Sequence, residues 1–182
     1  MNRLCSLGLD FKTVIDAGSN VGQFARAVHL RFPTARIVSI EPLPDVADHL
    51  SANLSDVAGH TVFRTALGSF DGETKFFRNS FSQSSSVMRM LEREGGLLEG
   101  TREIEDLCVP MARLDTLLDD SRLTPNVLLK LDLQGNELEA LRGAPNTLAR
   151  CSHVLLETVF EQEYAGEPLF EELWKFLGEH GF

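Results

Sequence analysis

The sequence is poor in the residues that would mark several common protein classes. It has three cysteines among 182 residues, far apart and without a C-x-x-C pair. Such cysteines are typical of small buried side chains in a reducing compartment, and they argue against disulfides or a thiolate metal site. No hydrophobic run approaches the ~18–20 residues that span a bilayer, and the N-terminus lacks the apolar core of a signal peptide. We therefore expect a cytoplasmic protein without a membrane span.

Positive charge is also scarce. Seventeen lysines and arginines stand against 27 acidic residues, which gives a formal net charge of −10. Nucleic acids and anionic membranes are bound through basic faces, so this balance argues against both as partners. The five histidines fall where structural or solvated roles are expected. They form no Ser-His-Asp or Cys-His arrangement that would indicate nucleophilic catalysis.

Short apolar runs alternate with helical patterns along most of the chain, which is long enough for one domain, 1–182. Strands are predicted over 13–16, 37–40, 61–65, 127–131 and 154–156, and helices over 22–32, 136–142, 171–180 and the segment containing Val46, Leu50 and Leu54. Asp71-Gly72 predicts a hairpin into a strand over 74–77. This alternation predicts an α/β fold with a doubly wound, mostly parallel sheet that binds ligands at the carboxyl ends of its strands.

The most informative motif lies in Val14–Phe24, which reads as a strand ending at an acid, a glycine turn and the start of a helix. Such a turn directs free backbone N–H groups at a ligand, with the helix dipole behind them. Gly18 would let a ligand approach the backbone, and Gly22 would let the helix lie close to the strand. Glu41 ends the next apolar strand, where it could accept hydrogen bonds from ribose hydroxyls.

The spacing of this motif separates two nucleoside ligands. A dinucleotide site favours G-x-G-x-x-G, whereas this chain has D-x-G-x-x-x-G, with Ser19 and Asn20 where a pyrophosphate would need room. Asp16 would repel a phosphate and would suit a cationic group, such as the sulfonium of S-adenosylmethionine. An NAD-dependent oxidoreductase is therefore the less favoured alternative.

Residues 79–106 interrupt the alternation of strands and helices. The segment is rich in serine, then in charged residues and glycine. A long stretch without regular structure in a compact domain is usually functional or mobile. Two interpretations stay open: a disordered loop, or a lid or substrate-recognition insert beside the ligand site.

A second motif runs over residues 128–137. Lys130, Asp132, Gln134, Gly135 and Glu137 fit the pattern K-x-D-x-[QE]-G-x-E, and a short helix with an Arg-Gly-Ala turn follows. Together with the first motif, Glu41-Pro42, Ser84-Ser85-Ser86 and Leu155-Leu156-Glu157, this block resembles the FkbM-type family of S-adenosylmethionine-dependent methyltransferases. The resemblance extends over about residues 13–182.

The resemblance implies a class I, Rossmann-like methyltransferase fold and methyl transfer from S-adenosylmethionine, usually to a hydroxyl of a sugar or natural product. It places the cofactor against Asp16, Gly18, Ser19, Asn20, Gly22, Glu41, Pro42, Ala66 and Leu67. It places the small-molecule or glycan acceptor near Ser84, Ser85, Ser86 and Lys130. Relatives carry an acid or asparagine near the end of strand three, so adenine recognition here is expected to rest on backbone groups and Leu67.

A hydroxyl acceptor must lose its proton, which requires a general base or a metal. Asp132 is the first candidate for orienting or deprotonating the acceptor, unless it only caps its turn, and Glu157 is the second. Glu137 is a third candidate, although it could instead stabilise its helix through the dipole. Lys130 could pair with a carboxylate or be solvated. Asp132, Glu137 and Glu157 could converge on a divalent ion, but nothing in the spacing requires a metal.

The family fold should continue beyond Phe182 into an antiparallel pair of strands, which this sequence does not contain. The strand over 154–156 would then be an exposed edge, which folded proteins usually avoid. Either the chain is a truncated or excised form, or another protomer covers the edge. A non-catalytic S-adenosylmethionine-binding domain is the corresponding alternative function.

Overall fold

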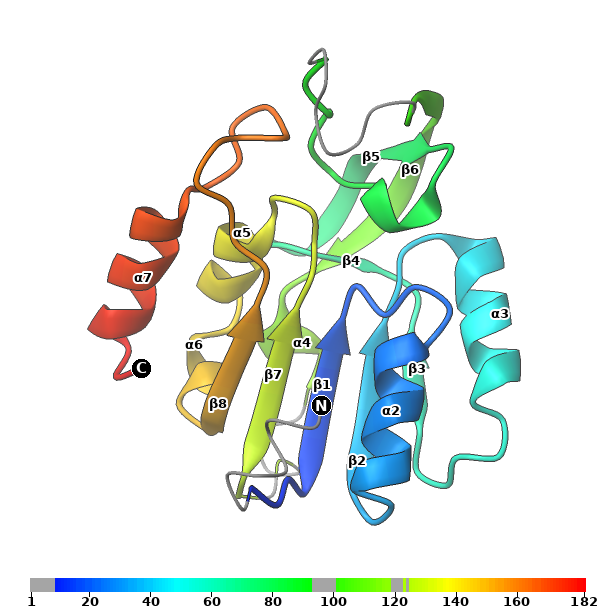
Figure 1. The fold of residues 1–182 in the computed structure, drawn as a ribbon, viewed down its shortest axis with the longest axis vertical. Coiled ribbons are helices and arrows are strands. Elements are labelled where there is room, and N and C mark those ends of the chain that lie inside the picture. Colours follow the sequence, from blue (N-terminus) through cyan, green and yellow to red (C-terminus); the bar gives the residue numbers. More distant parts are fainter. Residues whose placement is uncertain (1–8, 93–100, 119–122, 124) are drawn as a thin grey trace.

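The computed structural model describes residues 9–92, 101–118, 123 and 125–182. Its main sheet has five parallel strands in the order β3-β2-β1-β7-β8 (Figure 1). The strands are β1 (Thr13–Ala17), β2 (Arg36–Ile40), β3 (Thr61–Phe63), β7 (Val127–Leu131) and β8 (Cys151–Leu156). The predicted α/β fold with a mostly parallel sheet is confirmed.

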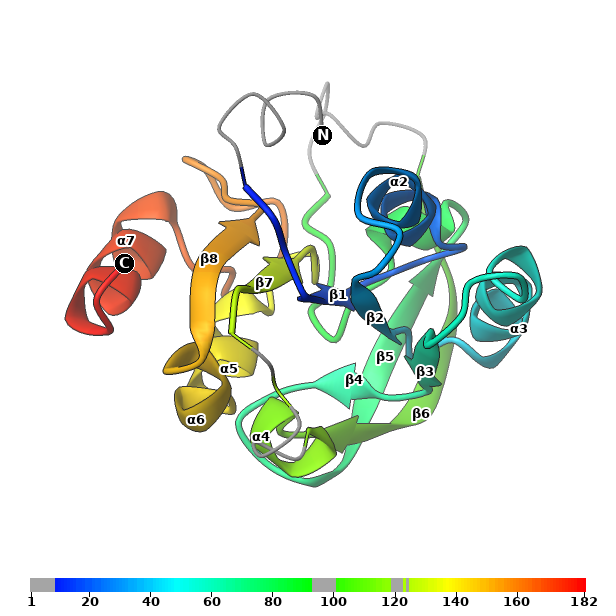
Figure 2. The same ribbon diagram turned by 90° about the horizontal axis from the view of Figure 1, so that it is seen from below.

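Helices cover both faces of this sheet (Figures 1 and 2). The helices are α2 (Gln23–Arg31), α3 (Pro44–Asn53), α4 (Leu114–Leu117), α5 (Glu137–Arg142), α6 (Pro145–Leu148) and α7 (Phe170–Glu179). Successive strand residues point to opposite faces. Val14 and Leu128 therefore join the core beside α2, whereas Ile15 and Leu129 join the core with α5 and α6. Burial on both faces explains why these strands read as continuous apolar runs. None of the helices among the described residues has the length and apolarity needed to cross a bilayer.

A second, smaller sheet contains β4 (Ala66–Leu67), β5 (Gly72–Asn79) and β6 (Glu103–Ala112), in the order β4-β6-β5. The hairpin predicted at Asp71-Gly72 is wrong. Within the second sheet β5 does not pair with the preceding strand, β4, and its antiparallel partner is β6. Likewise, the strand predicted over 61–65 ends at Phe63, and β4 pairs with β6 in the second sheet. In the second half of β6, Leu107, Val109 and Met111 are more buried than the residues between them, as expected for a strand with one face toward the core.

The predicted insert, 79–106, is more ordered than the sequence suggests where the structure describes it. It contains a 3₁₀ turn, η1 (Ser82–Ser84), and the start of β6, and its Ser86 forms a bridge to Phe77 of β5. Residues 93–100 lie outside the described part of the chain.

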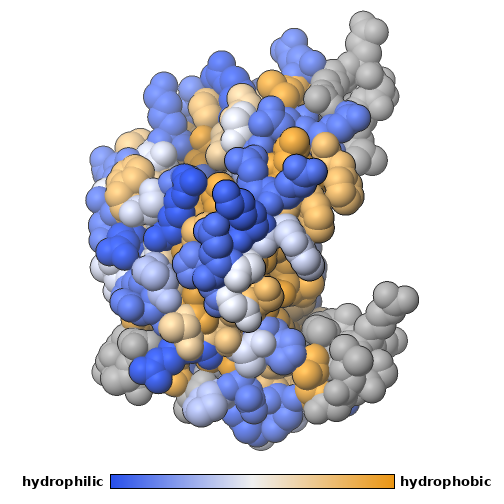
Figure 3. Space-filling model, turned by 90° about the vertical axis from the view of Figure 1, so that its left-hand side faces the viewer, coloured by the Kyte–Doolittle hydropathy of each residue, from blue (hydrophilic) through white to orange (hydrophobic). Residues whose placement is uncertain are grey.

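The main sheet ends at β8 on one side. Within the described residues no strand pairs with the outer edge of β8, and α7 is the last element before Phe182. On the side of the molecule that carries α7, hydrophobic residues reach the surface among hydrophilic ones (Figure 3). Leu155 of β8 is among the exposed large hydrophobic side chains.

Candidate active site

A cavity of about 480 Å³ lies at the carboxyl ends of the central strands. The strand order reverses between β1 and β7, and such reversal points are where open α/β sheets bind ligands. The volume falls within the ~300–1,000 Å³ range of small-molecule sites. Its walls come from the turn after β1, the end of β2, residues 65–67, the insert, the loop after β7, and Glu157 beyond β8.

Most of the predicted cofactor residues line this cavity. Those in the wall are Gly18, Ser19, Asn20, Glu41, Pro42, Ala66 and Leu67, whereas Asp16 and Gly22 are not part of it. The wall also contains residues that the sequence did not predict, among them Phe24, Phe76, Phe81, Ser82, Gln83 and Asn136.

Glu41 is held firmly in the wall. Its Oε2 accepts the backbone N–H of Asn20 at 3.0 Å, and its Oε1 accepts that of Leu43 at 3.0 Å. Burial raises the pKa of Glu41 to about 7, although the two N–H bonds favour the charged form. The carboxyl group therefore titrates near neutral pH and keeps a defined orientation at the cavity.

The motif predicted that the turn after β1 directs free backbone N–H groups at a ligand. In the structure these N–H groups are hydrogen-bonded within the protein. The N–H groups of Gly18 and Ser19 donate to the carbonyl of Ile40 at 3.0 and 3.1 Å. That of Asn20 donates to Glu41, and that of Gly22 donates to the carbonyl of Ser19. The end of β2 lies next to the turn, so the chain itself takes up these donors.

The two glycines of the motif also permit close contacts within the protein. Gly18 has φ +72°, and an added Cβ would lie 1.9 Å from the backbone oxygen of Asp132. Gly22 has φ +92°, and its Cβ would lie 2.8 Å from Leu50 of α3. Gly18 thus permits contact between two loops of the site, and Gly22 permits packing against α3 rather than against a strand.

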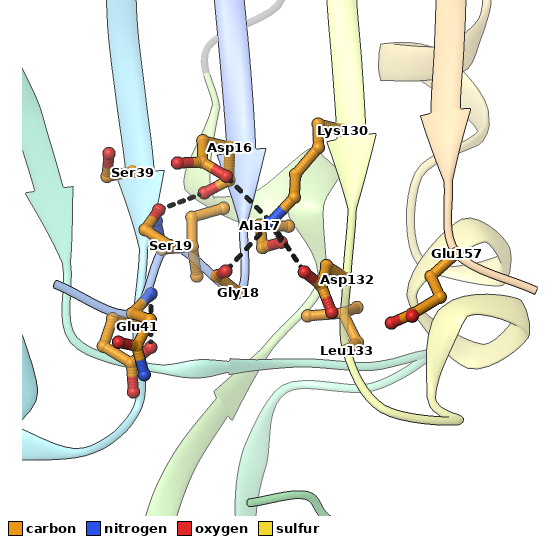
Figure 4. A network of polar contacts seen from close by, with 12 residues as sticks. Asp16, Ala17, Gly18, Ser19, Ser39, Glu41, Lys130, Asp132, Leu133 and Glu157 are labelled. Atoms are coloured by element: carbon orange, nitrogen blue, oxygen red, sulfur yellow. Dashed lines mark hydrogen bonds and ion pairs between the residues drawn. The ribbon is translucent and has the colours of Figure 1, made fainter. Parts of the chain in front are cut away.

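Lys130 joins two carboxylates at the strand ends (Figure 4). Asp16 and Lys130 are directly opposite on β1 and β7, and Lys130 Nζ lies 3.1 Å from Asp16 Oδ1 and 3.4 Å from Asp132 Oδ2. The same ammonium donates to the carbonyl of Gly18 at 3.0 Å. Of its two partners, Lys130 shares the cavity wall only with Asp132.

Asp16 is fully buried, and burial raises its pKa although Lys130 opposes the shift. Among the described residues, neither of its carboxylate oxygens accepts a well-aligned hydrogen bond, so the ion pair with Lys130 is its main contact. Asp16 therefore contacts Lys130 rather than the cavity, in contrast to the predicted contact with a cationic ligand.

Asp132 and Glu157 come together across the cavity wall, as their strand-end positions suggested. The amide nitrogen of Gln134 donates to Asp132 Oδ1 at 2.7 Å and to Glu157 Oε2 at 2.8 Å. Burial raises the pKa of Glu157, and the neighbouring Asp132 carboxylate raises it further. Both residues line the cavity.

Glu137 does not line the cavity. It is buried, and its Oε1 accepts the backbone N–H of Leu133 at 2.6 Å. Burial raises its pKa to about 7. This geometry fits a structural role rather than catalysis, although the contact is with the loop before α5 and the predicted structural role was stabilisation of the helix through its dipole. Across the described residues, no three His, Cys, Asp or Glu side chains are grouped to hold a metal ion.

The three serines predicted to contact the acceptor mainly hold the insert in place. Ser84 Oγ donates to the carbonyl of Phe81, and Ser85 Oγ accepts the N–H of Asn79. Ser86 Oγ donates to the carbonyl of Gln134 at 2.7 Å and lies outside the wall, whereas Ser84 and Ser85 are part of it.

Comparison with known proteins identifies the family of this chain. The model of the methyltransferase FkbM domain matches residues 16–182. The chain is 28% identical over 93% of its length to 9% of the AMB antimetabolite synthetase AmbE of Pseudomonas aeruginosa. It is 30% identical over 78% of its length to 54% of the hexuronic acid methyltransferase AglP of Haloferax volcanii. It is also 22% identical over 85% of its length to 66% of the 2-O-methyltransferase NoeI of Sinorhizobium fredii.

The chain therefore spans 9–66% of the length of these curated relatives. Among solved structures, the precorrin-6y C5,15-methyltransferase of Geobacter metallireducens aligns with 98% of this chain and 69% of its own, at 17% identity and a TM-score of 0.46. Because the family model covers nearly the whole sequence, the chain belongs to the methyltransferase FkbM family.

Proposed function

We propose that this protein transfers a methyl group from S-adenosylmethionine to a hydroxyl group of a sugar or natural product. One observation carries the proposal. A single cavity has Glu41 at the end of β2 on one side and the linked carboxyl groups of Asp132 and Glu157 on the other. The first suits a nucleoside and the second suits an acceptor that must lose a proton.

The residues present fit the proposed cofactor. Pro42, Leu67 and Phe76 give the cavity an apolar wall for a flat base, next to a carboxyl group for ribose hydroxyls. Among the described wall residues, the charged side chains are three carboxyl groups and Lys130. This excess of carboxyl groups over basic groups favours a cationic ligand over a pyrophosphate. When bound, S-adenosylmethionine supplies an electrophilic methyl group on a positively charged sulfur.

The protein's part in the reaction is then to orient the acceptor and to accept its proton. Asp132 is the proposed base, because it lines the cavity and its carboxylate is held in place by Lys130 at Oδ2 and by Gln134 at Oδ1. Glu157 is proposed to assist as a second carboxyl group. The insert is proposed to contact the acceptor, since exposed Phe81 offers an apolar face at the cavity and Gln83 offers a polar group. The relatives named hexuronic acid methyltransferase and 2-O-methyltransferase support a hydroxyl or sugar acceptor.

Calorimetry with S-adenosylmethionine and S-adenosylhomocysteine tests the cofactor site. We expect both to bind to the wild type and Glu41→Ala to weaken binding by about tenfold or more, because hydrogen bonds to a charged group contribute about 1.5–3 kcal/mol. Asp48→Asn is the matched control, because Asp48 is exposed and pairs with Arg64 on the surface, outside the cavity wall. Absence of binding to the wild type would refute the cofactor assignment.

Release of S-adenosylhomocysteine, measured with uronic acids and neutral monosaccharides as acceptors, tests the reaction. Asp132→Asn should lower kcat by about 10²–10⁴-fold, the usual contribution of a general base, while the cofactor affinity stays within about threefold. Full activity of Asp132→Asn would make Asp132 structural. Cofactor binding without turnover of any acceptor would favour the non-catalytic alternative.

A further inference from the structure

We propose that Tyr164 is a positioning residue that sets the geometry of the Asp132 and Glu157 carboxyl groups through the side chain of Gln134. This role rests on the proposed methyl transfer, in which the two carboxyl groups handle the acceptor's proton. Tyr164 is the only tyrosine in the chain, and it lies in the segment between β8 and α7.

The hydroxyl of Tyr164 is buried and hydrogen-bonded within the protein. Tyr164 is 1% exposed, and its hydroxyl lies 2.9 Å from Gln134 Oε1 and 2.9 Å from the backbone carbonyl of Ser84. Both partners are acceptors, so the hydroxyl shares its single hydrogen between them. Burial raises the pKa of Tyr164, which keeps that donor protonated. The oxygen end of the Gln134 amide is therefore turned toward Tyr164.

The nitrogen end of the same amide is turned toward the carboxyl groups. Its two hydrogens meet Asp132 Oδ1 and Glu157 Oε2, at nitrogen–oxygen distances of 2.7 and 2.8 Å. A flipped amide would direct its oxygen at the two acids and its nitrogen at a hydroxyl. The two acids select this orientation of Gln134 because they accept hydrogen bonds, and the Tyr164 hydroxyl anchors the oxygen end of the amide. The amide nitrogen is thereby held between the two acids.

This bridging donor matters because the two acids repel each other. Burial and the Asp132 carboxylate raise the pKa of Glu157, and the nearby Glu163 adds to the effect, whereas the hydrogen bond from Gln134 lowers it. Lys130 acts on the other side of Asp132. Loss of the Tyr164 hydroxyl would free the amide to rotate, which would remove the donor from Glu157 and loosen the pair.

The backbone around Tyr164 is built to keep it in place. Its segment pairs with the insert, since the N–H of Leu91 donates to the carbonyl of Glu163 and the N–H of Ala165 donates to that of Arg89, both at 2.8 Å. The buried Glu167 accepts the N–H groups of Glu163 and Tyr164 at 2.6 and 3.1 Å. Tyr164 therefore connects the insert to the carboxyl pair from a rigid position.

Carbon-13 NMR of the carboxyl groups, followed against pH, tests the proposal without any acceptor. Tyr164→Phe keeps the ring and removes only the hydroxyl, and we expect it to move the titration midpoint of Glu157 to higher pH. Gln134→Leu should do the same. Because Tyr164 acts through Gln134, adding Tyr164→Phe to Gln134→Leu should produce no further shift.

Thr147→Val is the matched control, because it removes a buried hydroxyl that donates to Asp115 at 2.8 Å, outside the cavity wall. It should leave the Glu157 midpoint unchanged. In turnover, Tyr164→Phe should lower kcat by about 10- to 100-fold, as expected for misplaced reacting groups, with the acid limb of the pH profile displaced to higher pH.

An unchanged Glu157 midpoint in Tyr164→Phe would overturn the proposal, as would additive shifts in the double variant. The proposed function fails separately, through absence of S-adenosylmethionine binding by the wild type. In that case the Glu157 titration still decides whether Tyr164 controls this carboxyl group.

Discussion

At the scale of single residues, buried Glu137 makes stability depend on pH. Its folded pKa of about 7 lies above the ordinary value of 4.5, so between these two pH values the folded state holds a proton that the unfolded state has lost. The stabilisation is on the order of 3 kcal/mol. It is complete below about pH 4.5 and is lost as the pH rises through about 7. The Glu137→Gln variant should not show this loss of stability, so at pH 8 it should be more stable than the wild type.

Urea unfolding at pH 4.5, 6 and 8 measures this difference. Glutamine retains an oxygen for the Leu133 N–H, and Glu41, which has a similarly raised pKa, is unchanged in both proteins. The difference between wild type and variant therefore isolates Glu137. A difference that does not vary with pH would contradict the prediction, and loss of turnover in a stable variant would restore Glu137 as a catalytic candidate.

Sequence reasoning found the residues whose position follows from strand ends, and missed those that depend on distant contacts. Glu41, Asp132 and Glu157 follow apolar strands of one parallel sheet, so their convergence on one edge was predictable. The structural role of Tyr164 depends on a carbonyl of the insert and on a glutamine 30 residues away. No local pattern in the sequence encodes such a contact.

At the scale of elements, the site depends on close contact between the turn after β1 and the loop after β7. Gly18→Ala would place a Cβ 1.9 Å from the backbone oxygen of Asp132 at φ +72°. Left-handed strain costs about 1–2 kcal/mol, and overpacking adds about 1–3 kcal/mol. We expect destabilisation of about 2–5 kcal/mol and loss of cofactor binding, measured by chemical unfolding and calorimetry.

Gly59→Ala separates the two costs. Gly59 has nearly the same φ, +78°, with nothing within 4 Å of an added Cβ. This control should cost only the strain, about 1–2 kcal/mol, and should bind cofactor normally. Equal destabilisation by the two substitutions would show that the turn after β1 and the loop after β7 can move apart without a loss of stability.

The order of the elements was easier to predict than their pairing. Short continuous apolar runs revealed the central strands, because parallel strands covered on both faces are apolar throughout. The segment that became β6 looked irregular because its first four residues are exposed and three of them are acidic. Only the alternation of Leu107, Val109 and Met111 indicates a strand, and its partner β5 lies beyond the insert.

At the scale of the whole molecule, the outer side of β8 and α7 is where the fold leaves apolar groups uncovered. Phe160 is 78% exposed and Trp174 is 70% exposed, and both rings contact Phe170. Exposed apolar patches and open strand edges are features that folded proteins usually cover. We therefore predict that a second copy of the chain covers this side.

Sedimentation velocity over a range of concentrations tests the predicted dimer. The only tryptophan is Trp174, so its fluorescence should shift to shorter wavelength as the dimer forms. Trp174→Arg should shift the protein to monomer, because an arginine there must be desolvated in the interface. Leu30→Arg is the matched control, since Leu30 is 77% exposed on α2, away from α7, and its loss should not affect association (Figure 1). A wild type that stays monomeric at all concentrations and melts cooperatively would show that this side is stable in water without a partner.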